Sequence, residues 1–485
     1  MKLFPFILLF LATISSFAQP VVYQSFETDS AAEPRGGMPS LSTFLQTNLR
    51  KPIEAEAQGI GGRVVLSGIV EPDGRLSDIN VVQSLRPDCD REALRVFSRF
   101  QAWRPAYKNG KAVRQFVSIP VTFKASKPFP YVNGNRISYY DANQNLLPDS
   151  SDLARYKQLT PTDSNGLPNG NILVYQLKRQ VWKEQATLPF VRKRSDLYSR
   201  YGKAIYRIGV VQQNNQWQGR VADVDETGAL VRQSFYNNGE RVGYQLDYYS
   251  NGLVAQRSDD ANGLYVFNAW HPNGQIKQIW TADKPKPGTP KSPDQVMAYW
   301  DSTGRQLVTE GNGSGSFTEL VQSKLDSTRQ TLFIEEGTYA GGLREGRWTG
   351  RYADGSYVYE EQYEKGICQT GKARTAGQDT VRYTQREQQP EFAGGMQGLG
   401  QFLASTLRYP PDAQRAHVQG QVMISFVVCT DGTLCDYEVV KPLHPAIDQE
   451  ALRVVKAMNG RWKPGAQRGQ NVRVQYRMPI NFALE

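Results

Sequence analysis

The spacing of apolar residues predicts the same series of elements near both ends of the chain. Apolar positions at helical spacing form one side of a first helix in each series: Leu41, Phe44, Leu45 and Leu49, then Leu399, Phe402, Leu403 and Leu407. Two apolar strands joined by an Asp-Gly turn follow, Arg63–Glu71 and Leu76–Val82 in the first series, and Asp-Gly between apolar runs is typical of a hairpin. A second helix is expected to begin near Asp90, and near Asp448 in the later series, with the aspartate as its N-cap.

The last strand of each series alternates strictly between apolar and polar residues. It covers 113–123 in the first series and 472–482 in the second, which predicts a strand with one buried face. Pro120 and Pro479 lie inside this pattern. Because proline has no N–H to donate to a sheet ladder, it is confined to edge strands or bulges. Each closing strand is therefore predicted to be a sheet edge with unpaired backbone groups on one side.

The two series are copies of one module. Roughly 28 of the 61 residues from Gly36 to Val96 are identical in the later copy, against about four expected by chance. The modules are placed at 34–125 and 388–485. Each is predicted to contain two helices and three main strands.

The region between the modules has a different pattern. Turn dipeptides recur every 11 to 13 residues, at Thr227-Gly228, Asn238-Gly239, Asn251-Gly252, Asn262-Gly263 and Asn273-Gly274, with short aromatic strands between them. Regular turns at this spacing predict antiparallel hairpin repeats over 201–377. Residues 126–200 are assigned to a connecting region of uncertain structure.

The first residues resemble a secretory signal over 1–18. Lys2 precedes an apolar stretch of about 15 residues, shorter than the roughly 20 that span a bilayer. The mature protein is therefore expected in the periplasm or cell envelope, with a retained membrane anchor as the alternative. The formal net charge of +10 is spread along the chain, so no nucleic-acid partner is expected.

The cysteines and histidines point to one candidate cross-link and to no metal. Cys429 and Cys435 flank the second Asp-Gly turn and are disulfide candidates, with two surface thiols as the alternative. The chain has three histidines, and none lies at metal-ligand spacing with another His or Cys. No catalytic motif was found, so no cofactor, no metal site, no small-molecule substrate and no enzymatic activity are predicted.

The terminal modules resemble the C-terminal domain of the TonB energy transducer. The second copy carries the motifs most fully: Pro390-Glu391-Phe392-Ala393-Gly394-Gly395, Tyr409-Pro410, Gly420-x-Val422, Asp431-Gly432, Asp448-x-Glu450-Ala451-Leu452, Trp462-Lys463-Pro464 and Met478-Pro479-Ile480-Asn481-Phe482. The first copy departs from them, with Lys51 in place of the tyrosine. The middle region is similar to MORN-type or antitoxin-like repeats, most clearly in Gly337-x-Tyr339-x-x-Gly342-x-x-x-Gly346-x-Trp348.

The resemblance implies an α+β fold for each module, with two helices on a three-stranded antiparallel sheet. It also implies a periplasmic protein that binds the TonB box, or a similar peptide, of an outer-membrane receptor and takes part in energy-coupled transport. In that family the peptide is added to the sheet as a strand, which agrees with the open edge predicted from the prolines. The candidate edge residues are Val472, Arg473, Val474, Gln475, Tyr476 and Arg477 in the second copy, and Val113, Arg114, Gln115, Phe116 and Val117 in the first. The alternative is an envelope scaffold whose repeats form the binding surface and whose end modules make a homodimer.

Overall fold

The computed structural model describes residues 21–195, 204–212, 215–261, 263–284, 292–326 and 328–484. The predicted signal segment 1–18 lies outside these residues. The described residues are mostly β, with 53% of them in strands and 14% in helices. None of the six helices in the described ranges has the length and hydropathy of a membrane span.

The chain divides into two compact units, residues 1–289 with 298–306, and residues 290–297 with 307–485. Each unit holds one end module and repeat strands. The chain passes between the units within β22 (Gln295–Trp300) and β23 (Gln306–Val308).

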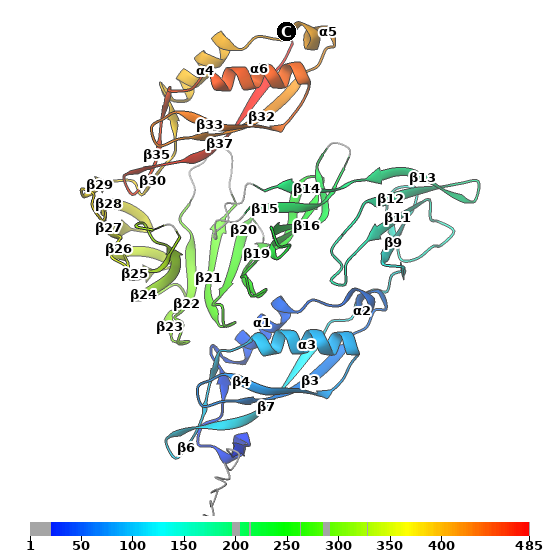
Figure 1. Ribbon diagram of the computed structural model, residues 1–485, viewed down its shortest axis with the longest axis vertical. Helices are drawn as coiled ribbons and strands as arrows, with labels where there is room; N and C mark the ends of the chain where they lie inside the picture. Colours follow the sequence, from blue (N-terminus) through cyan, green and yellow to red (C-terminus); the bar gives the residue numbers. More distant parts are fainter. Residues whose placement is uncertain are drawn as a thin grey trace, which may run out of the picture. The chain divides into compact units, whose positions relative to one another are not determined.

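The first module begins the first unit. Its elements are β1 (Val22–Tyr23), η1 (Ser25–Glu27), β2 (Glu33–Pro34), α1 (Gly37–Asn48), α2 (Ile53–Ala57), β3 (Gly62–Val70), β4 (Leu76–Gln83), α3 (Pro87–Arg99), β5 (Trp103–Arg104), β6 (Ala106–Lys108) and β7 (Lys111–Phe123). The main sheet has the strand order β1-β7-β3-β4, and β6 pairs with β7. Helices α1 and α3 lie on one face of this sheet (Figure 1).

The second module ends the second unit and repeats this plan. Its elements are β30 (Glu387–Gln388), β31 (Glu391–Phe392), α4 (Gly395–Thr406), α5 (Pro411–Arg415), β32 (Gly420–Val428), β33 (Leu434–Lys441), α6 (Pro445–Lys456), β34 (Trp462–Lys463), β35 (Gly465–Gln467), β36 (Gln470–Val472) and β37 (Val474–Phe482). Its main sheet is three-stranded, antiparallel and ordered β33-β32-β37.

Both modules have more elements than the sequence predicted. A short third helix, α2 or α5, follows a proline and packs Ile53 or Ala413 into the core. The predicted aspartate N-caps were wrong, since α3 and α6 begin at Pro87 and Pro445, three residues earlier. The two aspartates instead accept hydrogen bonds from the backbone N–H of Leu85 and Leu443, just before each helix.

The Asp-Gly turns are fixed by the tryptophan that follows the last helix of each module. Gly74 and Gly432 have φ of 81° and 82°. A Cβ at either position would lie 2.4 or 2.2 Å from the carbonyl oxygen of Trp103 or Trp462. Only glycine fits both the left-handed backbone and this close contact.

The middle region consists of antiparallel strands paired mainly in chain order. The connecting region forms a sheet of β8 (Tyr131–Val132), β9 (Asn135–Tyr140), β10 (Leu146–Leu147), β11 (Tyr156–Pro161), β12 (Ile172–Lys178) and β13 (Val181–Leu188). The first repeat sheet contains β14 (Phe190–Arg194), β15 (Ile205–Val211), β16 (Trp217–Asp225), β17 (Leu230–Asn237), β18 (Glu240–Tyr248), β19 (Val254–Ala261), β20 (Leu264–Trp270) and β21 (Ile276–Asp283).

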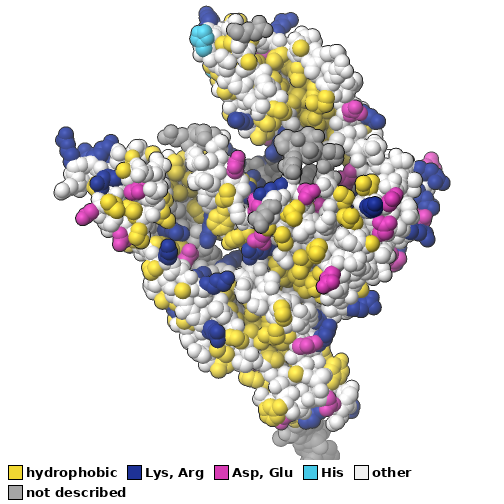
Figure 2. All heavy atoms as spheres, turned by 180° about the vertical axis from the view of Figure 1, so that it is seen from behind, with side chains coloured by type: hydrophobic (Ala, Val, Ile, Leu, Met, Phe, Trp, Pro, Cys, Tyr) yellow, Lys and Arg dark blue, Asp and Glu magenta, His cyan; other side chains and the backbone are white. Residues whose placement is uncertain are grey.

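The second repeat sheet belongs to the second unit. It contains β24 (Gly313–Gln322), β25 (Gln330–Ala340), β26 (Leu343–Tyr352), β27 (Tyr357–Glu364), β28 (Ile367–Thr375) and β29 (Val381–Tyr383), in that order. Figure 2 shows basic and acidic side chains interspersed over one face of the molecule, in agreement with the evenly spread charge of the sequence.

Candidate functional site

The candidate edge of the second module is the outer side of β37. Its inner side pairs with β32 from Gly420↔Phe482 to Val428↔Val474 without a bulge. Within the described residues, no strand pairs with its outer side. Val474 to Arg477 lie in β37, whereas Val472 ends β36, where it pairs with Gly465, and Arg473 lies between the two strands.

The position of Pro479 shows which backbone groups face outward. Pro479 lies opposite Met423 in the ladder and has no N–H. It therefore occupies a pair without hydrogen bonds, and its backbone points away from β32. Because direction alternates along a strand, Gln475, Arg477 and Asn481 present their N–H and C=O groups at the outer edge. Their side chains are exposed.

The corresponding edge of the first module carries a strand from the same chain. β1 pairs in parallel with β7, with Val22 opposite Arg114 and Tyr23 opposite Gln115. This pairing occupies Arg114 and Gln115, two of the five residues predicted from the sequence to lie at the open edge. Val113 pairs with Ala106 of β6, Phe116 is 37% exposed and Val117 is buried.

The side chain of Gln115 holds the segment that follows β1. It is 2% exposed, and its carbonyl oxygen accepts hydrogen bonds from the N–H of Ala32 at 2.9 Å and the hydroxyl of Thr28 at 3.4 Å. The corresponding residue in β37 is Val474, which has no side-chain acceptor. The segment at the corresponding place in the second copy is β29, and β29 pairs with β28 of the repeat sheet rather than with β37.

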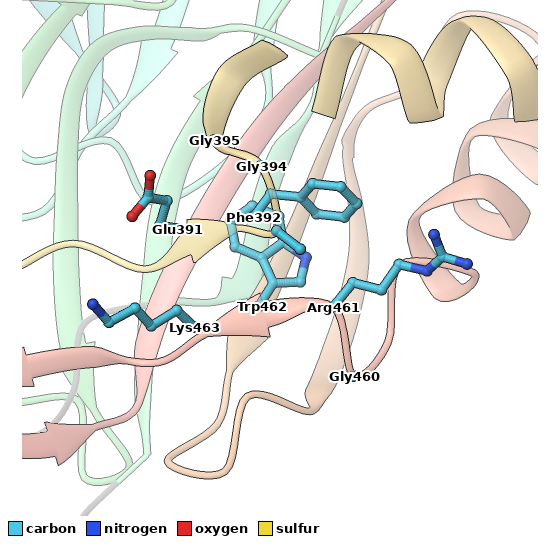
Figure 3. Close-up of a pocket in the computed structure, with 9 residues that line it drawn as sticks. Glu391, Phe392, Gly394, Gly395, Gly460, Arg461, Trp462 and Lys463 are labelled. Atoms are coloured by element: carbon cyan, nitrogen blue, oxygen red, sulfur yellow. The ribbon is translucent and has the colours of Figure 1, made fainter. Parts of the chain in front are cut away.

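A shallow pocket of about 560 Å³ lies beside the β31–β34 pair of the second module (Figure 3). Glu391 and Lys463 lie on one side of it and Arg461 on the other. The rings of Phe392 and Trp462 meet edge-to-face at 5.6 Å behind it. Gly394, which also lines the pocket, is exposed.

The corresponding surface of the first module is covered by a turn of the first repeat sheet. The N–H of Gln101 donates to the carbonyl of Asn273 at 2.9 Å. The neighbouring Gly274 packs so closely on Phe44 and Phe100 that a Cβ would lie within 3.0 Å of both rings. In the second module, the counterpart Phe402 remains partly exposed.

The second module contacts its own repeat sheet through Arg468, at the tip of the β35–β36 hairpin. Arg468 is 7% exposed, and its guanidinium donates to Glu361 at 2.8 Å and lies 3.6 Å from the ring centre of Tyr359. Burial alone would raise the pKa of Glu361, but the hydrogen bonds and charge of Arg468 hold that pKa below its usual range. Tyr363 and Tyr383 donate to the same carboxylate at 2.9 Å.

The sequence did not identify Arg468 as a binding residue, because an Arg-Gly pair at a hairpin tip is typical of solvent-exposed turns. The available signal was the difference between the copies, since the first module has the exposed Asn109 at this position. His271, His417 and His444 belong to no group of three or more possible metal ligands in the described part of the chain.

Comparison with known proteins supports the resemblance of the two end modules. Residues 48–125 and 405–484 match the family of the Gram-negative bacterial TonB protein C-terminal domain. The match confirms the family predicted from the motifs, at both ends of the chain, and the middle region lies outside it. This family is typical of Gram-negative envelope proteins that interact with outer-membrane receptors.

Solved structures give partial matches. Two solution structures of the TonB C-terminal domain of Helicobacter pylori are 27% and 26% identical to the chain, cover 19% and 18% of it, and are themselves covered to 80% and 91%, with TM-scores of 0.17 and 0.16. A periplasmic gluconolactonase of Pseudomonas aeruginosa is 9% identical, with 67% of this chain and 97% of the other covered and a TM-score of 0.12. Such low TM-scores establish no overall structural similarity. No curated protein matches the chain.

Proposed function

We propose that the protein is an exported, non-enzymatic binding protein of the cell envelope. Its second module takes a TonB-box or similar peptide of an outer-membrane receptor as an added strand along β37, in the service of energy-coupled transport. The observation that carries the proposal is the contrast between the two closing strands. β7 pairs with the short strand β1, whereas the matching side of β37 has no strand partner in the described residues.

The pairing of β1 with β7 is an internal precedent for strand addition. A two-residue extended segment is held there by main-chain pairing, with a buried glutamine fixing the chain that follows it. Added strands gain affinity from main-chain hydrogen bonds and specificity from alternate side chains. The outward backbone groups of Gln475, Arg477 and Asn481 supply donors and acceptors for such bonds.

The proposal is tested by blocking the edge at one backbone atom. Arg477→Pro removes an outward N–H and leaves the ladder to β32 intact, whereas Arg477→Ala removes the same side chain and keeps the N–H. With the full chain and a synthetic TonB-box peptide, the proline variant should bind at least about tenfold more weakly than the alanine variant, since a main-chain hydrogen bond is lost and the peptide is displaced sterically.

Two controls separate strand addition from other binding. A peptide N-methylated at alternate residues should not bind, and Ser118→Pro, at the matching position of β7, should leave the affinity unchanged. Equal binding by the Arg477 proline and alanine variants would contradict the proposal. Self-association through β37, measured by sedimentation velocity in the absence of peptide, would instead favour the scaffold whose end modules form a homodimer.

A further inference from the structure

The turn between β32 and β33 carries a pair of cysteines near the beginning of β37. The Sγ atoms of Cys429 and Cys435 lie 2.6 Å apart, as free thiols. The turn between them is closed by hydrogen bonds from the Cys429 N–H to the Thr433 carbonyl at 2.8 Å and from the Gly432 N–H to the Cys429 carbonyl at 3.0 Å. Joining the two sulfur atoms therefore needs no rearrangement of the backbone.

The first module has a hydrogen-bonded pair at the same two positions. Glu71 and Ser77 correspond to Cys429 and Cys435, and the Ser77 hydroxyl donates to the Glu71 carboxylate at 2.5 Å. Both hairpins close with the same backbone pattern, since Gly74 donates to the Glu71 carbonyl at 2.8 Å. The two copies thus place a mutually interacting side-chain pair across one turn, and only the chemistry of the pair differs.

The arginine next to this pair also occurs in both modules. Arg114 donates to Glu71 at 2.8 Å and lies 3.3 Å from Asp78. Its counterpart Arg473 donates to Asp436 at 2.7 Å and contacts Cys435 at 3.3 Å. The thiol that contacts Arg473 is no ionic partner at neutral pH, because burial and the hydrogen bond with Cys429 raise the pKa of Cys435 to about 11. Cys435 therefore has no ionic role corresponding to that of Glu71.

We propose that Cys429 and Cys435 are a disulfide site that locks the β32–β33 turn near the beginning of β37. One cysteine, as its thiolate, attacks the disulfide of an exchange partner and releases one partner thiolate. The second cysteine then attacks the mixed disulfide, which forms the intramolecular bond and releases the second partner thiolate. The two cysteines lose two protons and two electrons, and the partner disulfide is reduced to a dithiol.

Oxidation leaves the charges around Arg473 unchanged. The disulfide sulfur, like the neutral thiol, carries no charge, so Asp436 stays the ionic partner of Arg473, whose side chain is 58% exposed. In the cell this modification rests on the export proposed above, because disulfides persist in oxidising compartments.

The site is tested on purified full-length protein, independently of its location in the cell. The protein is equilibrated with oxidised glutathione, its free thiols are alkylated, and it is cleaved by a protease specific for aspartate. Cleavage before Asp431 separates Cys429 from Cys435, so the two peptides stay joined when the disulfide is present. We expect the joined peptides in the wild type, with Cys89 and Cys368 alkylated.

Two variants serve as controls. Cys435→Ser should abolish the joined peptides and leave Cys429 open to alkylation. The double variant Cys429→Glu with Cys435→Ser gives the turn the pair of the first module, so it should keep the fold and form no cross-link. Alkylation of both thiols in the oxidised wild type, or linkage of either one to Cys89 or Cys368, would overturn the proposal.

Hydrogen exchange measures the effect on the turn. Amides of the 429–435 turn should exchange about tenfold more slowly in the oxidised than in the reduced wild type, since the cross-link restricts local opening. Equal exchange rates would overturn the locking role. Thiol trapping in intact cells then tests export: a bond formed in vitro and absent in cells would contradict the exported location while supporting the disulfide site.

Discussion

The two end modules share a fold but contact the repeat sheets through different surfaces. The first module uses its helical face, where Asn48, Gln101 and Phe44 meet the turns of the first repeat sheet. The second module uses a hairpin tip, with Arg468 buried against Glu361 of the second repeat sheet. The closing strands differ as well. β7 pairs with β1, whereas no strand in the described residues pairs with the outer side of β37.

This difference shows that the duplication preserved the core and reassigned the surface. Buried positions stay apolar, and some keep the same residue, as in Trp103 and Trp462. Positions on the outside have changed in ways that decide which surface is covered and which is exposed. The surface covered in one copy is therefore a guide to what the other copy still offers to a partner.

The largest expected effect comes from Arg468. Arg468→Asn gives the hairpin tip the residue of the first module, which also tolerates the left-handed backbone, with φ of 50° at both positions. Removing one partner of a buried ion pair should lower the free energy of unfolding of the second unit by about 3–5 kcal/mol. Chemical denaturation of the full chain, followed by hydrogen exchange in 357–375, measures this loss.

The reverse exchange is the matched control. Asn109→Arg places the arginine on an exposed turn, so stability should change by less than about 0.5 kcal/mol. Similar losses for both variants would show that the turn, rather than the ion pair, carries the effect.

A smaller effect is expected at the helical face. The side-chain oxygen of Asn48 accepts a hydrogen bond from the buried N–H of Val254 at 2.7 Å. Asn48→Ala leaves that N–H unpaired and should lower the stability of the first unit by about 1–3 kcal/mol. The control is Thr406→Ala, at the matching and partly exposed position of the second module, which should have little effect. A larger loss from Thr406→Ala would indicate an unrecognised contact on that face.

The smallest expected effect is a pH dependence of the second unit. The pKa of Glu361 is lowered in the folded protein, so its contribution to stability is present above the ordinary glutamate value of 4.5 and is lost as pH falls through the folded pKa. Below about pH 4.5, the free energy of unfolding should fall by up to roughly 1.4 kcal/mol per pH unit for each proton taken up. In Arg468→Asn this dependence should be weaker. Parallel pH profiles for the wild type and the variant would rule out the Arg468 pair as the cause.

The sequence predicted the parts of the fold that depend on local periodicity. The Asp-Gly hairpins, the first helix of each module and the alternating strand around Pro479 follow from patterns that the chain itself carries. The short helices α2 and α5 were missed because five residues contain too little periodicity. Asp90 was misread as an N-cap because its carboxylate binds the chain before the helix from a position inside the first turn.

The contacts that distinguish the two modules were beyond the reach of sequence patterns. Strand β1 has two residues, so no alternation marks it as a strand. Arg468 and Glu361 are separated by 107 residues, and nothing local to either one indicates burial. The open edge was predicted for both copies from Pro120 and Pro479, and the structure distinguishes them because β1 lies along one of these edges.

The most direct test of this account is hydrogen exchange of the full chain with and without a TonB-box peptide. Strand addition to β37 should slow exchange in 474–482 when the peptide is bound, centred on Gln475 and Arg477, with no change in 111–123. Equal protection of both closing strands, or protection confined to 111–123, would contradict the claim that the second module presents the binding edge.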